Sequence, residues 1–129
     1  MKTNEELLEM TNTLLQYRMF ILERFELAKS TGEQGDFYEE VKPFADKVKL
    51  MTDEWRENAL SWLTMNPQRH LHTRQIDSTA ENLEMVSISG FFPNTSKKKF
   101  LDHVQSIEFV LRSLIKAIED QQGVPQQSR

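Results

Sequence analysis

The fold follows from residues 97–118, which read KKKFLDHVQSIEFVLRSLIKAI. Apolar side chains recur there every three or four positions, and a helix that turns by 100° per residue gathers such positions onto one face. The resulting stripe comprises Phe100, Val104, Ile107, Leu111, Leu114, Ile115 and Ile118. A helix with one apolar stripe must bury it against other elements, so the fold depends on what stripes the rest of the chain carries.

Three further segments have the same helical spacing, and no run alternates with period two for long enough to predict a strand. The first segment places on one face Leu7, Leu8, Leu14, Leu15, Ile21, Leu22 and Phe25. The second carries Phe37, Val41, Phe44, Val48, Met51, Trp55, Ala59 and Trp62. The third, roughly residues 73–90, has a weaker seam of mostly small side chains, Ile76, Ala80, Leu83, Val86, Ser87 and Gly90.

The ends of these segments carry capping signals. Thr3 with Glu6 forms a capping-box pattern, and Asp36 with Glu39 three residues later opens the second segment. One residue of 94–96 (Asn, Thr, Ser) should cap the last segment. Pro43 lies inside the second segment, where the apolar stripe keeps its phase, so we expect a kink there and no break.

Turn-forming residues cluster at 30–35, 66–67 and 90–96, which leaves only short connections between the four segments. Helices joined by short loops pack as antiparallel neighbours. The chain is therefore predicted to be all-α, an antiparallel up-down-up-down four-helix bundle. Residues 1–122 should form this single domain, and residues 123–129, which have nothing to bury, should form a disordered tail.

Composition excludes several classes of function. The 129 residues contain 16 basic and 20 acidic side chains, and the resulting net charge of −4 disfavours nucleic-acid binding. The run Lys97-Lys98-Lys99 fits the solvated start of a helix better than an anion-binding site. The absence of cysteine excludes disulfides and thiolate nucleophiles. A polar, acidic N-terminus and the lack of a long apolar run predict a cytoplasmic protein that does not enter a membrane.

Catalytic and metal-binding patterns are also missing from the sequence. None of His70, His72 and His103 has a glutamate three residues before it, as the di-metal helical bundles require. His70 and His72 with Asp77 make too small a ligand set for a specific metal site. There is no Gly-x-Ser-x-Gly motif and no phosphate-binding glycine loop. We predict no catalytic residue, no metal, no cofactor and no enzymatic activity.

Arg18 is the most informative polar residue, because it lies in the centre of the first apolar stripe. In an antiparallel bundle it is level with Glu84 and Glu108, so we predict a pairing with one of these carboxylates. The favoured interpretation is an ion pair that fixes register, or a side chain that extends to solvent. The alternative is a polar group inside a ligand cavity, for which the small residues of the third segment leave room.

A second set of apolar residues lies off the stripes, and it includes Met85, Ile88, Phe92 and Phe109. An exposed apolar patch of this kind is a candidate surface for a protein partner or for a second copy of the chain. The alternative is that the third helix is rotated, so that it buries Met85, Ile88 and Phe92 and exposes its small residues.

The sequence also resembles the YppE-like family of small, uncharacterised proteins from Gram-positive bacteria. The residues that carry the resemblance are Leu7-Leu8-Glu9-Met10-Thr11, Phe37-Tyr38-Glu39-Glu40-Val41-Lys42-Pro43, Trp55 with Ala59-Leu60, His72 to Ile76, and Lys98-Lys99-Phe100. The resemblance implies a cytoplasmic four-helix bundle of unknown function and brings no catalytic or binding residues with it.

Taken with the residue patterns, the expected function is that of a non-enzymatic helical bundle that acts on an unknown protein partner or as a homodimer. The alternative is a small-ligand or metal-binding bundle that uses the region of Arg18 or the histidines.

Overall fold

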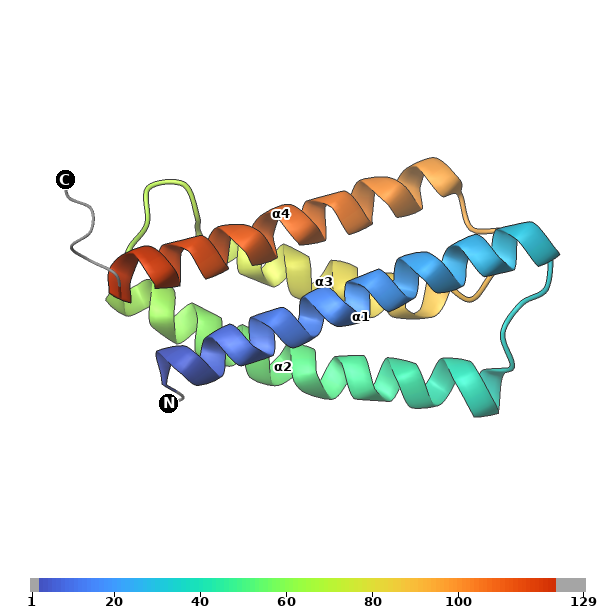
Figure 1. The fold of residues 1–129 in the computed structure, drawn as a ribbon, viewed down its shortest axis with the longest axis horizontal. Helices are drawn as coiled ribbons and strands as arrows, with labels where there is room; N and C mark the ends of the chain where they lie inside the picture. The colour runs from blue at the N-terminus through green and yellow to red at the C-terminus, as the bar shows by residue number, and fades with distance from the viewer. Residues whose placement is uncertain (1–2, 123–129) are drawn as a thin grey trace.

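Four long α-helices make up most of the structure, a computed structural model that describes residues 3–122. They are α1 (Asn4–Thr31), α2 (Lys42–Met65), α3 (Thr73–Ser89) and α4 (Lys97–Gln122), and a π-helical turn, η1 (Phe37–Val41), leads directly into α2. The helices run alternately up and down, and α1 and α3 each pack against both α2 and α4 (Figure 1). The predicted all-α bundle is confirmed. The predicted tail, residues 123–129, lies outside the described residues.

Among residues 3–122, no helix has both the length and the apolar character that crossing a membrane requires.

The helix ends largely follow the capping signals. Both bonds of the capping box between Thr3 and Glu6 are present at the start of α1, and Asp36 accepts a hydrogen bond from the backbone N–H of Glu39 at the start of η1. At the start of α4 the cap is Ser96, whose hydroxyl accepts from the backbone N–H of Lys99. Helix α1 ends at Gly32, whose φ of 74° is the left-handed conformation that favours glycine.

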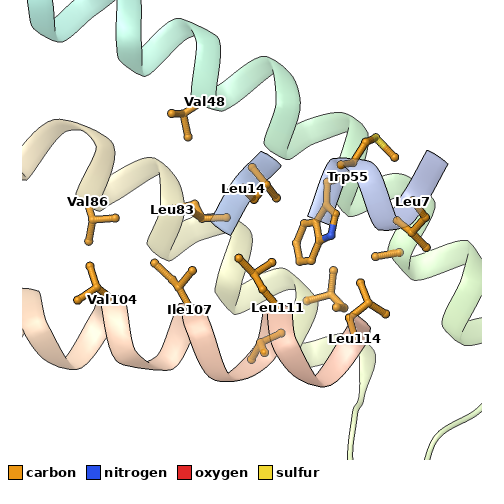
Figure 2. Packing of buried hydrophobic residues seen from close by; sticks show 14 of the residues in the cluster. Leu7, Leu14, Val48, Trp55, Leu83, Val86, Val104, Ile107, Leu111 and Leu114 are labelled. Atoms are coloured by element: carbon orange, nitrogen blue, oxygen red, sulfur yellow. The ribbon is translucent and has the colours of Figure 1, made fainter. Parts of the chain in front are cut away.

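The core lies along the bundle axis and is built mainly from the predicted stripes (Figure 2). It also contains four residues outside those stripes, Met10, Leu63, Leu71 and Val110. Trp55 and Thr11 are fully buried, and the indole Nε1 of Trp55 donates to Oγ1 of Thr11 over 3.0 Å. That hydroxyl in turn donates to the carbonyl of Leu7 over 2.7 Å. On α3 the buried residues are Ile76, Thr79, Ala80, Leu83, Val86 and Ser87. The alternative of a rotated third helix is therefore wrong.

The entry into α2 differs from the expectation at one residue, Phe37, which was assigned to the apolar stripe but is 52% exposed. The backbone N–H of Lys42 bonds to the carbonyl of Phe37, five residues back, so η1 contains one residue more per hydrogen-bonded turn than an α-helix. The extra residue rotates Phe37 out of phase with the stripe. Pro43 then falls in the first α-helical turn, where its missing N–H costs least, and the chain stays helical through it.

Candidate functional site

The predicted interior polar site divides into two unconnected parts. Arg18 is 8% exposed; its Nε donates to the carbonyl of Val104 over 2.6 Å, and its Nη2 lies 3.2 Å from Oε1 of Glu108. The predicted pairing of Arg18 with Glu108 is thus present. Glu84 does not join it, because its carboxylate lies 4.0 Å from Nζ of Lys49 on α2.

Glu108 sits at the solvent edge of the α1–α4 seam, between two arginines. Nε of Arg112 donates to its Oε2 over 2.9 Å, and this hydrogen bond, together with the charge of Arg18, lowers the pKa of the Glu108 carboxyl. The carboxylate therefore stays charged and holds Arg18, on α1, to α4. This geometry fits the interpretation as an ion pair that fixes the register of the two helices.

Gly90, which follows the last residue of α3, allows close helix packing. A Cβ added to Gly90 would lie 3.1 Å from Cγ2 of Ile21 and 3.3 Å from the carbonyl oxygen of the same residue. Gly90 therefore lets α1 approach the end of α3 across the bundle, and the space that the sequence suggested for a ligand is filled there by Ile21.

The predicted partner surface is brought together only in part. Met85 and Ile88 lie one helical turn apart on α3 and are both exposed, and Phe92 is half-buried in the turn that follows. Phe109 is 63% exposed on α4, but it lines a separate cleft of about 250 Å³ beside the loop that contains His70. Met85 and Ile88 form one stripe, and Phe109 belongs to another part of the surface.

The histidines are spread over the loop before α3 and the start of α4. His70 lines the cleft beside Phe109, His72 donates its backbone N–H to the side chain of Gln75 at the start of α3, and His103 is half-buried on α4. Within residues 3–122 no three histidine, aspartate or glutamate side chains are grouped so as to hold a metal ion.

A groove that the sequence pattern did not reveal lies between α1, α2 and the turn after α3. Three rings form its walls: the centroids of Phe20 and Phe44 are 4.8 Å apart, and those of Phe44 and Phe91 are 5.9 Å apart. We call this feature, of about 390 Å³, the aromatic groove. Its walls leave no periodic signal in the sequence, because Phe91 lies in a turn and Phe44 shares the spacing of the core stripe.

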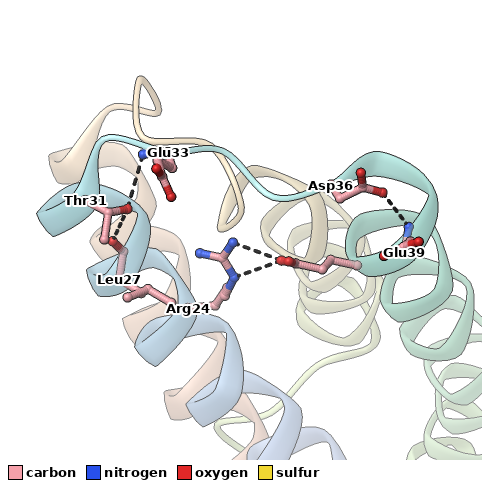
Figure 3. Close-up of polar contacts among 7 residues, drawn as sticks. Arg24, Leu27, Thr31, Glu33, Asp36 and Glu39 are labelled. Atoms are coloured by element: carbon pink, nitrogen blue, oxygen red, sulfur yellow. Dashed lines mark hydrogen bonds and ion pairs between the residues drawn. The ribbon is translucent and has the colours of Figure 1, made fainter.

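Arg24 closes one side of the aromatic groove. Its Nε and Nη2 both donate to a single oxygen, Oε1 of Glu40, over 3.3 and 2.9 Å (Figure 3). Its guanidinium lies 5.1 Å from the centre of the Phe91 ring. The third nitrogen, Nη1, is buried without a hydrogen-bond partner among the described atoms. Arg24 therefore links α1 to η1 with one donor left unused.

A backbone contact holds the loop after α1 against the same groove. The N–H of Gly35 donates to the carbonyl of Phe91 over 2.9 Å, and a Cβ added to Gly35 would lie only 2.7 Å from Cδ1 of that ring. Only glycine allows the two loops to approach so closely.

Charged residues of opposite sign lie on the rim of the aromatic groove. Glu39, Pro43 and Lys47 all line it from η1 and α2. Glu39 and Lys47 are exposed, and neither makes an ion pair with another residue in the part of the chain that the structure covers. The ammonium of Lys47 lies 5.4 Å from the centre of the Tyr17 ring. The rim thus carries one acid and one base that make no ion pair within residues 3–122, and the base contacts the Tyr17 ring.

Comparison with known proteins identifies relatives across nearly the whole chain. The sequence is 23% identical to the uncharacterized protein YppE of Bacillus subtilis over 111 residues, which cover 86% of this chain and 90% of YppE. The crystal structure of YppE matches with a TM-score of 0.89 at 22% identity, over 94% of this chain and 98% of YppE. The predicted resemblance to the YppE-like family is confirmed.

Two further solved structures share the fold. A protein of unknown function from Listeria innocua matches with a TM-score of 0.87 at 28% identity, over 92% of this chain and 95% of its own. A protein from Staphylococcus aureus matches with a TM-score of 0.80 at 21% identity, over 91% of this chain and 99% of its own. The bacterial domain of unknown function DUF1798 matches residues 11–118. The chain therefore belongs to the DUF1798 family.

Proposed function

We propose that this protein is a cytoplasmic, non-enzymatic binding protein that holds a protein partner against the exposed face of α3. The observation that carries the proposal is the exposure of Met85 and Ile88 on the face of α3 that points away from the core. Large apolar side chains in a contiguous exposed stripe are typical of interaction surfaces.

The spacing of these residues fits recognition of one helix by a groove in another protein. Met85 and Ile88 stand at positions i and i+3 of α3, a spacing with which an amphipathic helix presents its anchors, and Phe92 follows in the turn after the helix. Methionine adapts its shape to the partner, and the half-buried ring of Phe92 is already partly held in place. Phe109, on its separate part of the surface, is proposed as a second contact.

The alternative of a small ligand or metal held near Arg18 or the histidines has less support. Arg18 already bonds to Val104 and Glu108, and Ile21 packs against Gly90 where space was expected. No observation in the described structure favours a ligand there over these protein contacts.

The proposal is tested by affinity capture with matched surface variants. Ile88→Glu introduces a charge into the α3 stripe, and Met65→Glu introduces the same charge at an exposed methionine at the end of α2. We expect the wild type and Met65→Glu to retain the same partner and Ile88→Glu to lose it, with all three proteins melting at similar temperatures. Equal capture by Ile88→Glu and the wild type would overturn the assignment of this surface.

A further inference from the structure

The cleft beside Phe109, between the α2–α3 loop and the last turns of α4, has an unequal lining of charge (Figure 1). We call it the Phe109 cleft. Arg69, His70 and Lys116 contribute basic side chains to it, and Asp120 contributes the one acid. Nζ of Lys116 lies 2.9 Å from Oδ2 of Asp120, so these two charges neutralise each other. Arg69 is exposed and makes no ion pair within residues 3–122, which leaves the lining with one uncompensated positive charge.

The α2–α3 loop is locally basic although the chain as a whole is acidic. The net charge of the chain is −4, yet residues 58–76, which include the whole loop, contain two arginines, two histidines and no acid. A negatively charged partner is attracted to a positive patch and repelled by surfaces of its own sign. The charge distribution therefore favours this end of α4 as the place where an acidic partner binds.

Two contacts hold the basic part of the loop in place. The side chain of Leu71 is 4% exposed and belongs to the hydrophobic core. On the other side, Nε2 of Gln68 donates to the carbonyl of Asn66 over 2.9 Å. Arg69 and His70 lie between these contacts, so binding requires little additional ordering of the backbone.

The opposite wall of the Phe109 cleft, on α4, offers an apolar ring beside polar groups. Phe109 is 63% exposed, more than either Met85 or Ile88 of the α3 stripe. Ser113 lines the cleft one helical turn after Phe109 and carries a hydroxyl that can donate to an anion. The guanidinium of Arg69 presents paired N–H donors that match the two oxygens of a carboxylate. A carboxylate next to an aromatic side chain satisfies both walls at once.

We propose that the Phe109 cleft binds an acidic segment of a protein partner, with a carboxylate held by Arg69 and a neighbouring aromatic side chain packed on Phe109. This inference rests on the proposed function, in which Phe109 is a second contact, and names the chemistry of the partner at that contact.

Amide NMR titrations of the isotope-labelled chain test the proposal with three tripeptides blocked at both ends. The acidic probe is Glu-Phe-Glu, the neutral probe Gln-Phe-Gln and the basic probe Lys-Phe-Lys. We expect the acidic probe to shift the amide signals of Arg69, His70 and Phe109, with a dissociation constant at least about tenfold below that of the neutral probe. The basic probe should bind more weakly than the neutral one. Glutarate, which carries two carboxylates and no ring, should bind at least about tenfold more weakly than the acidic probe.

Matched variants separate the contribution of Arg69 from that of overall charge. Arg69→Gln should weaken binding of the acidic probe at least about tenfold and leave binding of the neutral probe unchanged. Arg74→Gln removes the same charge from an exposed arginine in the first turn of α3, outside the cleft lining, and should change neither. Phe109→Ala should weaken both probes, because both pack on the ring. Circular dichroism checks that all three variants are folded, which is expected because the three side chains are exposed.

Several results would overturn the proposal: an acidic probe that binds no better than the neutral probe or glutarate, shifts outside the cleft, or equal losses in Arg69→Gln and Arg74→Gln. The Ile88→Glu variant leaves the cleft intact, so it should bind the acidic probe as the wild type does. Failure of the α3 surface therefore appears in affinity capture and failure of the cleft in the titrations, and the two can be told apart.

Discussion

The hydrogen bond between Trp55 and Thr11 joins α1 to α2 inside the core, and Thr11→Val removes its acceptor. Valine has nearly the shape of threonine, so the main consequence is an indole N–H left without a partner in a fully buried site. Leaving such a donor unsatisfied costs about 1–3 kcal/mol. The carbonyl of Leu7 also loses the Thr11 hydroxyl, but it keeps its helical backbone bond, so this loss adds little.

A double-mutant cycle measures this contribution separately from changes in packing. We expect Thr11→Val to lower the free energy of unfolding by about 1–3 kcal/mol in the wild type. For a chain of this length that corresponds to roughly 4 °C in Tm per kcal/mol. In a Trp55→Phe background the same substitution should cost little, because no indole N–H remains to be left unpaired. Urea unfolding followed by circular dichroism gives all four free energies. An equal cost of Thr11→Val in both backgrounds would refute the reasoning.

Three further predictions concern the helix contacts. Arg18→Met keeps the buried part of the side chain and removes the ion pair, so it should change the free energy of unfolding by less than about 1 kcal/mol. Arg18→Ala also removes the buried part and should cost about 2–3 kcal/mol. Urea unfolding in which Arg18→Met costs more than Arg18→Ala would contradict this. The folded pKa of Glu108 is lowered, so its stabilising effect is complete above the unfolded pKa of about 4.3 and is lost as pH falls through the folded value. The stability difference between wild type and Glu108→Gln should therefore shrink in acid, and a difference that grows there would exclude this role. Gly90→Ala pushes a methyl group against Ile21 and should lower the free energy of unfolding by about 1–3 kcal/mol, measured in thermal melts. A variant as stable as the wild type would show that this close approach is not needed.

Most of the core could be predicted from the sequence, because an α-helix converts spacing directly into a face. Phe100, Val104 and Ile107 are buried on α4 where their spacing placed them, and so are the small residues of α3. Arg18 could be matched with Glu108 because antiparallel helices of known length fix which residues are level. The height of each residue along the bundle axis did not distinguish Glu108 from Glu84 as the partner of Arg18, since that choice depends on how each helix is rotated about its own axis.

The aromatic groove could not be predicted, because it arises where the regular period is interrupted. The π-helical turn rotates Phe37 outward and brings Glu40 toward Arg24, and a 100° step does not describe such a turn. Phe91 is buried although it follows the end of α3, where periodicity carries no information. The groove thus depends on one local irregularity and one loop contact, neither of which leaves a repeating signal in the sequence.

The bond between Gly35 and Phe91 has a consequence for how the chain can be reconnected. It joins the α1–α2 loop to the α3–α4 loop at one end of the bundle, while α1 begins and α4 ends at the other end, beside the α2–α3 loop (Figure 1). A circular permutant that links residue 122 back to residue 3 and opens the chain at 67–70 keeps both helical hairpins and the bond between their loops. A permutant opened at 33–35 places chain ends beside Gly35, so this residue is no longer held against Phe91 by a closed loop, and the two ends of this bundle are not equivalent places to begin a protein.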